Sequence, residues 1–268
     1  MSKSLNASIK AVLTSALLMV AITACGGGAE ATKNGASDNS SAVVSSESAA
    51  ECFTTKIITS ELNYSVYASE IGLAGTLSNT SAITDGTSFN GHNNLQRDTM
   101  KSIETYGAII RKSTSDTYST TEQTSDGLIG YDYGSTTVTD QGTSEDKISP
   151  PALERIATLK KGEIFTYTAK GKTTFIGLNG KRQESDLGVR IDQTYLGQEK
   201  VTVPAGVFDV CVFRMYDQVL QFTNYHYISK SNGVLVLITK NYPKNDASSD
   251  FRTELLAGSR VNGVLIQR

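Results

Sequence analysis

The sequence predicts a mainly β protein: a curved, twisted antiparallel sheet, either a half-barrel or a sandwich, with at most one or two short helices. Tyr outnumbers Phe by 12 to 8, Trp is absent and Thr and Ser are abundant, which suits a solvated antiparallel sheet better than helices. Short runs of β-branched and aromatic residues alternate with turn dipeptides that contain glycine. The most apolar block, residues 207–216, has the length of one strand.

The first 24 residues are typical of an export signal peptide. Lys3 and Lys10 supply positive charge, and residues 11–24 form an uncharged, mostly apolar run of 14 residues. This run is shorter than the roughly 20 apolar residues that a transmembrane helix needs. No second run of that length follows, so we expect the remainder of the chain to be soluble.

The end of the apolar run resembles the bacterial lipobox. Ile22, a branched apolar residue, is followed by the small residues Thr23 and Ala24 and then by Cys25. In lipoproteins with this motif the cysteine thiol carries diacylglycerol and its freed amine carries a fatty acyl chain such as palmitate. The resemblance implies that Cys25 is lipidated and holds the protein on a membrane. By the same resemblance Gly26 points to the outer membrane of the cell envelope, with the body facing the periplasm or the cell surface. The alternative is an ordinary signal peptide with an incidental cysteine.

Residues 25–50 are predicted to be a disordered linker that follows the lipidated cysteine. They are rich in Gly, Ser, Ala and Asn, and such a segment cannot bury enough apolar surface to offset the entropy of ordering it. Residues 51–268 are predicted to form a single β domain, with a candidate sub-boundary near residues 140–151. Removing residues 1–24 takes two lysines from 25 basic residues and leaves 23 against 27 acidic ones. The net charge near −4 argues against a non-specific nucleic-acid binder and against binding to anionic membrane surfaces.

The first half of the body is predicted to contain strands and tight turns. The turn dipeptides are Asp85-Gly86, Asn90-Gly91 and Asp126-Gly127, where glycine supplies positive φ cheaply. The expected strands are residues 53–60, 62–68, 95–113, 117–124 and 128–139. One short helix is expected over residues 151–159, because Pro151 can occupy the first helical position.

The second half is predicted to be a clearer meander. The expected strands are residues 163–169, 172–178, 182–195, 199–203, 207–216, 219–229, 234–240, 251–256 and 261–267. Lys170-Gly171, Asn179-Gly180 and Asn232-Gly233 are the expected turns. Within residues 207–216, Phe208, Val210 and Val212 point to one face, and Cys211, Phe213 and Met215 point to the other. A strand that is apolar on both faces belongs in the middle of a sheet with cover on both sides.

The cysteine count predicts a disulfide. With Cys25 lipidated, only Cys52 and Cys211 remain, in a compartment that oxidises thiols. We therefore expect them to be bonded to each other, and two unpaired buried thiols are the alternative. A redox role is not expected, because the sequence has no Cys-x-x-Cys.

Residues 201–211, Val-Thr-Val-Pro-Ala-Gly-Val-Phe-Asp-Val-Cys, resemble the VPAGTFD segment of exported bacterial β proteins of uncharacterised function. Tyr225-His226-Tyr227 and Gly233-Val234-Leu235-Val236 fit the aromatic strand and the glycine turn that follow in those proteins. The match covers roughly residues 150–240, departs from the pattern at Val207, and is structural rather than catalytic. It implies, as a fold analogy, the curved half-barrel sheet of lipoprotein-carrier proteins.

No constellation of residues predicts catalysis, a cofactor or a metal. The two histidines are His92, in a polar turn, and His226, which we expect to be a partly buried sheet residue. A Ser-His-Asp hydrolase would have to use one of them, and no Gly-x-Ser-x-Gly elbow is present. Three aspartates lack calcium-loop spacing, and four tyrosines suit cross-strand packing better than a glycan or peptide surface. These residues are Asp126, Asp132, Asp140, Tyr131, Tyr133, Tyr225 and Tyr227.

The sequence thus favours a lipid-anchored, non-enzymatic envelope protein whose curved sheet binds an apolar ligand or a protein partner. A structural or assembly component of an envelope complex is the alternative, and a hydrolase that uses His226 is a third. A lined cavity of a few hundred Å³ would favour ligand binding.

Overall fold

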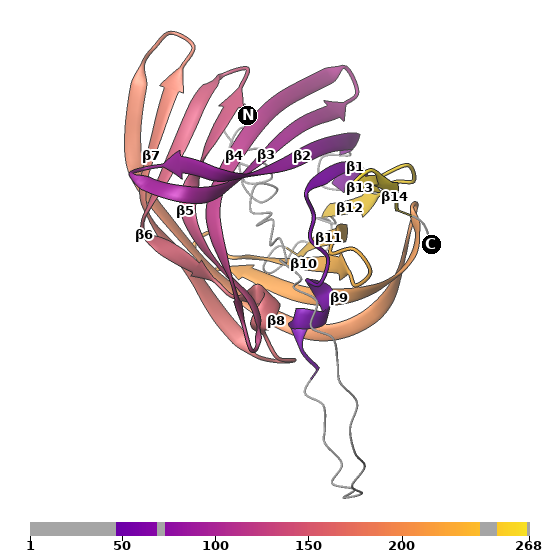
Figure 1. Cartoon of the computed structure of the whole chain (residues 1–268). Helices are drawn as coiled ribbons and strands as arrows, with labels where there is room; N and C mark the ends of the chain where they lie inside the picture. Colours follow the sequence, from indigo (N-terminus) through magenta and orange to yellow (C-terminus); the bar gives the residue numbers. More distant parts are fainter. Residues whose placement is uncertain (1–46, 69–72, 242–250, 267–268) are drawn as a thin grey trace, which may run out of the picture.

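The chain closes twelve sequential antiparallel strands into a barrel (Figure 1). The computed structural model describes residues 47–68, 73–241 and 251–266. Within these residues each strand pairs with its sequence neighbours, and β12 also pairs with β1. The strands are β1 (Thr59–Ala68), β2 (Leu73–Phe89), β3 (His92–Tyr106), β4 (Ile109–Thr124), β5 (Gly127–Thr139), β6 (Gly142–Glu154), β7 (Ile164–Gly177), β8 (Arg182–Val203), β9 (Gly206–Asp217), β10 (Phe222–Ser229), β11 (Leu235–Asn241) and β12 (Phe251–Leu255).

The prediction of a mainly β protein is confirmed, but the half-barrel or sandwich was wrong because the first and last strands of the sheet meet. We call their contact the seam. Residues Tyr64 to Ala68 of β1 pair with Leu255 to Phe251 of β12. Next to the seam, Ser60 and Glu61 of β1 pair with β13 (Arg260–Val261), which forms a hairpin with β14 (Val264–Leu265). Hydropathy patterns report which segments are strands, and they carry no signal for whether the two edges of a sheet join.

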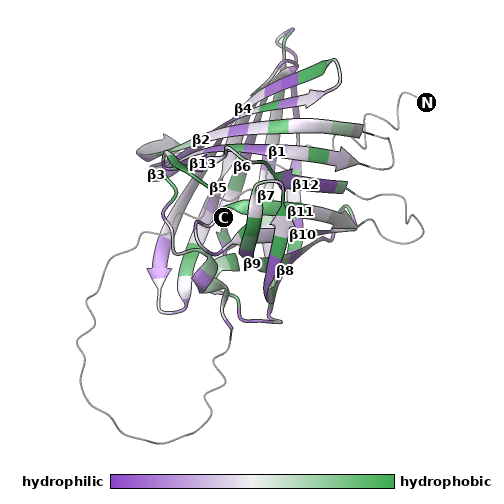
Figure 2. Ribbon diagram, turned by 90° about the vertical axis from the view of Figure 1, so that its right-hand side faces the viewer, coloured by the Kyte–Doolittle hydropathy of each residue, from purple (hydrophilic) through white to green (hydrophobic). Residues whose placement is uncertain are grey.

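Alternate residues of every strand face the inside of the barrel, the lumen. Following the register around the sheet, Tyr64 of β1 lies opposite Leu77 of β2 and Leu255 of β12, and all three are buried. Apolar residues are frequent in β9 and β11, whereas β2–β6 carry many polar ones (Figure 2). The lumen therefore has an apolar wall on the side of β8–β12 and β1, and a more polar wall elsewhere.

Strand β9 is covered on both faces, as predicted. Phe208, Val210 and Val212 pack in one buried cluster with residues of β1, β11 and β12. On the opposite face, Phe213 and Met215 pack in a second cluster with residues of the two short helices. This strand is the apolar centre of the barrel.

Several hairpin turns lie where glycine predicts them. Asn90 and Gly91 have φ of 48° and 80° and connect β2 to β3. The predicted turns at Asp85-Gly86 and Lys170-Gly171 were wrong, because both dipeptides lie inside strands. Gly86 lies at a register shift in β2, and a side chain on Gly171 would collide with the backbone carbonyl of Lys147 in β6.

Two short 3₁₀ helices close one end of the barrel. They are η1 (Ala49–Cys52) and η3 (Ile156–Thr158), and with the adjoining residues 47–48 and 159–161 we call them the plug. Ala49 N–H donates to the Leu159 carbonyl (2.8 Å) and Lys161 N–H donates to the Glu47 carbonyl (3.0 Å). The plug thus ties the start of the described chain to the loop between β6 and β7.

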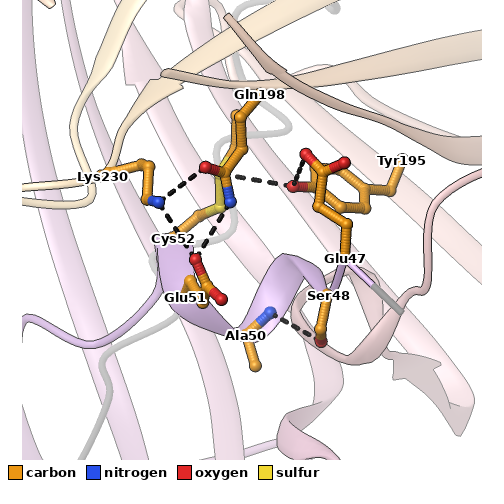
Figure 3. Close-up of a disulfide and its surroundings, with 9 residues drawn as sticks. Glu47, Ser48, Ala50, Glu51, Cys52, Tyr195, Gln198 and Lys230 are labelled. Atoms are coloured by element: carbon orange, nitrogen blue, oxygen red, sulfur yellow. Dashed lines mark hydrogen bonds and ion pairs between the residues drawn. A yellow bond between two sulfur atoms is a disulfide. The ribbon is translucent and has the colours of Figure 1, made fainter. Parts of the chain in front are cut away.

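The predicted disulfide between Cys52 and Cys211 is present and bonds the plug to β9, with Cα atoms 6.2 Å apart. A polar cluster surrounds it (Figure 3). Glu51 accepts hydrogen bonds from Gln198 (3.0 Å) and Lys230 (3.0 Å). These bonds join η1 to β8 and to the turn after β10, so the plug is held from several sides.

The structure corrects three predicted boundaries, two at the plug and one in β6. Residues 47–50, assigned to the linker 25–50, belong to the folded body, and Ala49 is fully buried. The helix expected over residues 151–159 shrinks to η3, because β6 continues to Glu154. Strand β6 also runs through the candidate sub-boundary near 140–151, so no division of the barrel falls there.

Cys25 and residues 1–24, the predicted signal peptide, lie outside the described residues. No helix in the described part of the chain has the length and apolar character needed to span a membrane.

Candidate functional site

The candidate site is the part of the lumen enclosed by β8, β9 and β10, at the end opposite the plug. We call this end, which carries the turns after β7 and β9, the open end. The register stacks three rows of inward-facing residues there. From the open end inward, the rows are Ile191–Asp217–Phe222, Gln193–Met215–Asn224 and Tyr195–Phe213–His226.

A cavity of about 330 Å³ lies against these rows. Its apolar lining comes from Leu187, Val189 and Ile191 of β8, together with Met215 and Phe222. Val219 and Leu220, in the turn between β9 and β10, border its mouth and are 61% and 51% exposed. The volume lies within the range of small-molecule sites, and such sites are mostly apolar with a few polar groups.

The inner part of the cavity carries two polar groups that lack partners. Asn224 is 7% exposed and lines the cavity, and its Oδ1 has no hydrogen-bond partner among the described residues. His226 also lines the cavity, and its buried Nε2 likewise has no hydrogen-bond partner among the described residues. Burial lowers the pKa of His226 from 6.5 to about 4, so the ring is neutral at neutral pH. Buried polar atoms are normally hydrogen-bonded, so both atoms have unused hydrogen-bonding capacity next to the cavity.

Two buried carboxyl groups also face the lumen, on β5 and β6. Glu154 accepts hydrogen bonds from Gln193 Nε2 (2.7 Å) and Ile156 N–H (2.8 Å), and Asp132 accepts one from the Tyr167 hydroxyl (3.0 Å). Burial raises the pKa of Glu154 to about 7, although the Gln193 hydrogen bond opposes the shift. Burial likewise raises the pKa of Asp132 to about 6. These groups order the lumen wall and hold η3 at its start.

The structure separates most of the residues singled out in the sequence. His226 lines the cavity, whereas His92 is exposed beside the turn between β2 and β3. The ring centroids of His92 and Tyr133 are 4.6 Å apart. Asp126 and Asp140 are in turns that follow β4 and β5, at opposite ends of the barrel, while Asp132 faces the lumen. No group of three or more His, Cys, Asp or Glu in the described chain could hold a metal ion.

The tyrosines do not form one surface. Tyr131 and Tyr133 are on β5, and Tyr225 and Tyr227 are on β10, and these strands are not neighbours. All four side chains alternate with lumen-facing residues and therefore point outward. All four are therefore half-exposed sheet residues, and they do not form a common binding surface.

Sequence reasoning missed the lumen residues Asn224, Gln193 and Glu154. Asn224 has a local signal, because it is a polar residue on the strand face that also carries Phe222, His226 and Ile228. Glu154 was hidden inside the predicted helix. Gln193 and Glu154 gain their meaning only from the register of the closed barrel.

No protein-family model matches the chain, and no curated protein matches it. A solved structure that it resembles is a β-barrel-like protein of domain of unknown function DUF1849 from Brucella abortus. The two are 12% identical with a TM-score of 0.36, and the match covers 76% of this chain and 98% of that one.

Proposed function

We propose that this is a lipid-anchored, non-enzymatic envelope protein that binds an apolar ligand in the lumen of its barrel. The cavity beside β8, β9 and β10 carries the proposal, because it combines a volume of about 330 Å³ with an apolar lining and inner polar groups. The plug covers the other end of the barrel, so the ligand enters from the open end. Cys25, the proposed lipid site, keeps the barrel at the membrane.

The ligand site is tested by filling it. Ile191 lines the cavity and is half-buried, so Ile191→Trp should abolish binding of a neutral apolar dye, N-phenyl-1-naphthylamine, measured by its fluorescence. Ile176→Trp is the matched control, because Ile176 is 42% exposed on the outer face of β7. Equal dye binding by both variants, or no binding by the unmodified protein, would contradict the proposal.

The anchor is tested separately. Cys25→Ala should move the protein from the membrane fraction to the soluble fraction of the expressing cell. Unchanged partitioning would remove the anchor from the proposal and leave the ligand site untouched.

A second candidate function is docking of a protein partner at the open end. The described turns and strand ends there carry exposed aliphatic side chains, each more than 50% exposed: Ile109, Ile110, Leu178, Val219 and Leu220. A barrel that acts as a component of an envelope complex would use such a rim. Leu178→Ser would then release a co-purifying protein, whereas Val264→Ser at the other end would not.

A further inference from the structure

We infer that the lumen selects an amphiphile with an uncharged head group that both donates and accepts hydrogen bonds, such as a hydroxyl or a primary amide, inserted head-first. The inference rests on the proposed ligand site and adds the chemical class of the ligand. It is carried by the partnerless polar atoms of Asn224 and His226 in the cavity lining.

These two groups lie deep in the cavity. Strand β10 begins at the open end with Phe222 and continues inward through Asn224 to His226. Four residues of strand span about 14 Å, so an extended alkyl chain can reach from the mouth to His226. The walls above the two groups are Leu187, Val189 and Phe222. A polar head therefore belongs at the inner end and an apolar tail toward the mouth.

The two atoms need a head group with both hydrogen-bonding roles. Asn224 Oδ1 only accepts, and Nε2 of a neutral His226 donates or accepts according to its tautomer. A hydroxyl offers one donor and two acceptor positions, so it can serve both atoms at once. The side chains are two residues apart on one face of β10, about 7 Å along the strand, which places them around a single head group.

The charges disfavour an ionised head. None of the described residues that line the cavity is Lys or Arg, whereas the lining includes Asp217 and Asp186. The Asp186 carboxylate is paired with Lys172 (2.8 Å), so Asp217 is the acidic lining residue without a salt bridge among those described. A carboxylate has no proton to donate to Asn224 Oδ1 and would meet a neutral imidazole. An ammonium could donate to Asn224 but would lose its hydration in an apolar cavity, and burial of an uncompensated charge is expensive.

Calorimetric titration of the full chain with three ten-carbon probes tests this inference. At pH 7.5, 1-decanol should bind about 10-fold or more tighter than decanoate or decylammonium, the ratio expected when buried polar groups go unpaired. Binding of all three with equal affinity, or tightest binding of either ion, would overturn the head-group inference while leaving the apolar site standing. No binding of any probe would instead contradict the proposed function.

Substitutions locate the effect. Asn224→Leu keeps the volume and removes the acceptor, so it should weaken decanol binding about 10-fold and leave decanoate unchanged. His226→Phe should act in the same direction, whereas His226→Gln should restore part of the preference. Thr223→Val is the control, because Thr223 is the outward-facing neighbour on β10. If both Asn224→Leu and His226→Phe kept the full preference for decanol, the two residues would not be the head-group site. A cooperative unfolding transition in urea verifies that each variant is folded.

Discussion

Glu154→Gln should remove much of the pH dependence of the barrel's stability between about pH 4.5 and pH 7. Glu154 is 2% exposed and contacts Gln193 and Ile156 through hydrogen bonds. Burial raises its pKa from 4.5 to about 7, and the neighbouring Asp132 carboxylate adds to the increase. A glutamine has the same shape and cannot ionise, so it imitates the protonated acid at every pH.

The sign follows from the protons bound in each state. Between about pH 4.5 and pH 7 the folded Glu154 keeps its proton while the unfolded chain has released it. The folded state binds more protons, so the free energy of unfolding falls as pH rises, by about 1.4 kcal/mol per unit. Over this window the loss amounts to about 3 kcal/mol. Asp132, whose pKa is raised to about 6, acts in the same direction. His226 acts in the opposite direction below pH 6.5 because its pKa is lowered to about 4.

Urea unfolding from pH 4.5 to pH 8, with the disulfide intact, measures the difference between the two proteins. Asp132 and His226 are present in both proteins, so the difference reports Glu154 together with its interaction with Asp132. Glu154→Gln should match the unmodified protein near pH 4.5 and exceed its stability by about 3 kcal/mol at pH 8. Glu122→Gln, at an exposed carboxyl of β4, serves as the control and should leave the pH profile unchanged. Parallel profiles for the unmodified protein and Glu154→Gln would refute the reasoning.

Three further predictions concern the plug, the strand packing and the core. Replacing Cys52 and Cys211 together by serine should lower the free energy of unfolding by up to about 5 kcal/mol, since their bond closes a long loop; an unchanged urea midpoint would contradict this. Gly171→Ala should destabilise by about 1–3 kcal/mol because of its collision with a β6 carbonyl. By contrast, Gly188 has open space where a Cβ atom would lie, so Gly188→Ala should leave the stability unchanged or raise it. Thermal unfolding of the two alanine variants measures the difference. Tyr64→Phe removes a buried hydrogen bond of 3.0 Å to a β11 carbonyl and should lower the free energy of unfolding by about 1–3 kcal/mol. Equal stability of the two proteins in urea would contradict this.

Local features of the fold were predictable because they depend on a few adjacent residues. The alternation of side chains and the turn dipeptides Asn90-Gly91 and Asn179-Gly180 predicted strands and turns, and the two faces of β9 followed from the pleat. The pairing of Cys52 with Cys211 followed from the cysteine count once Cys25 was assigned to the lipobox. The strands and these turns rest on rules that involve only adjacent residues.

Closure of the sheet and the content of the lumen were not predictable in this way. Gly171 has the signal of a turn, yet its role is to let β6 and β7 approach closely, which is a property of the neighbouring strand. Asn224 and Gln193 share one row of the lumen only because of the register across β8, β9 and β10. Residues 47–50 have the composition of a linker, and they are ordered by contacts with the loop between β6 and β7.

The seam between β1 and β12 has a consequence for the order in which the barrel assembles. Every other strand pair of the barrel joins sequence neighbours, whereas the seam joins Tyr64 to Leu255, so it carries the largest loop-closure entropy. We expect it to form last, from an open curved sheet like the one that the sequence pattern suggests. Such an intermediate exposes two unpaired strand edges, which are sites of aggregation. The disulfide shortens that stage, because Cys52 lies just before β1 and its bond to β9 holds the start of β1 beside the second half of the sheet.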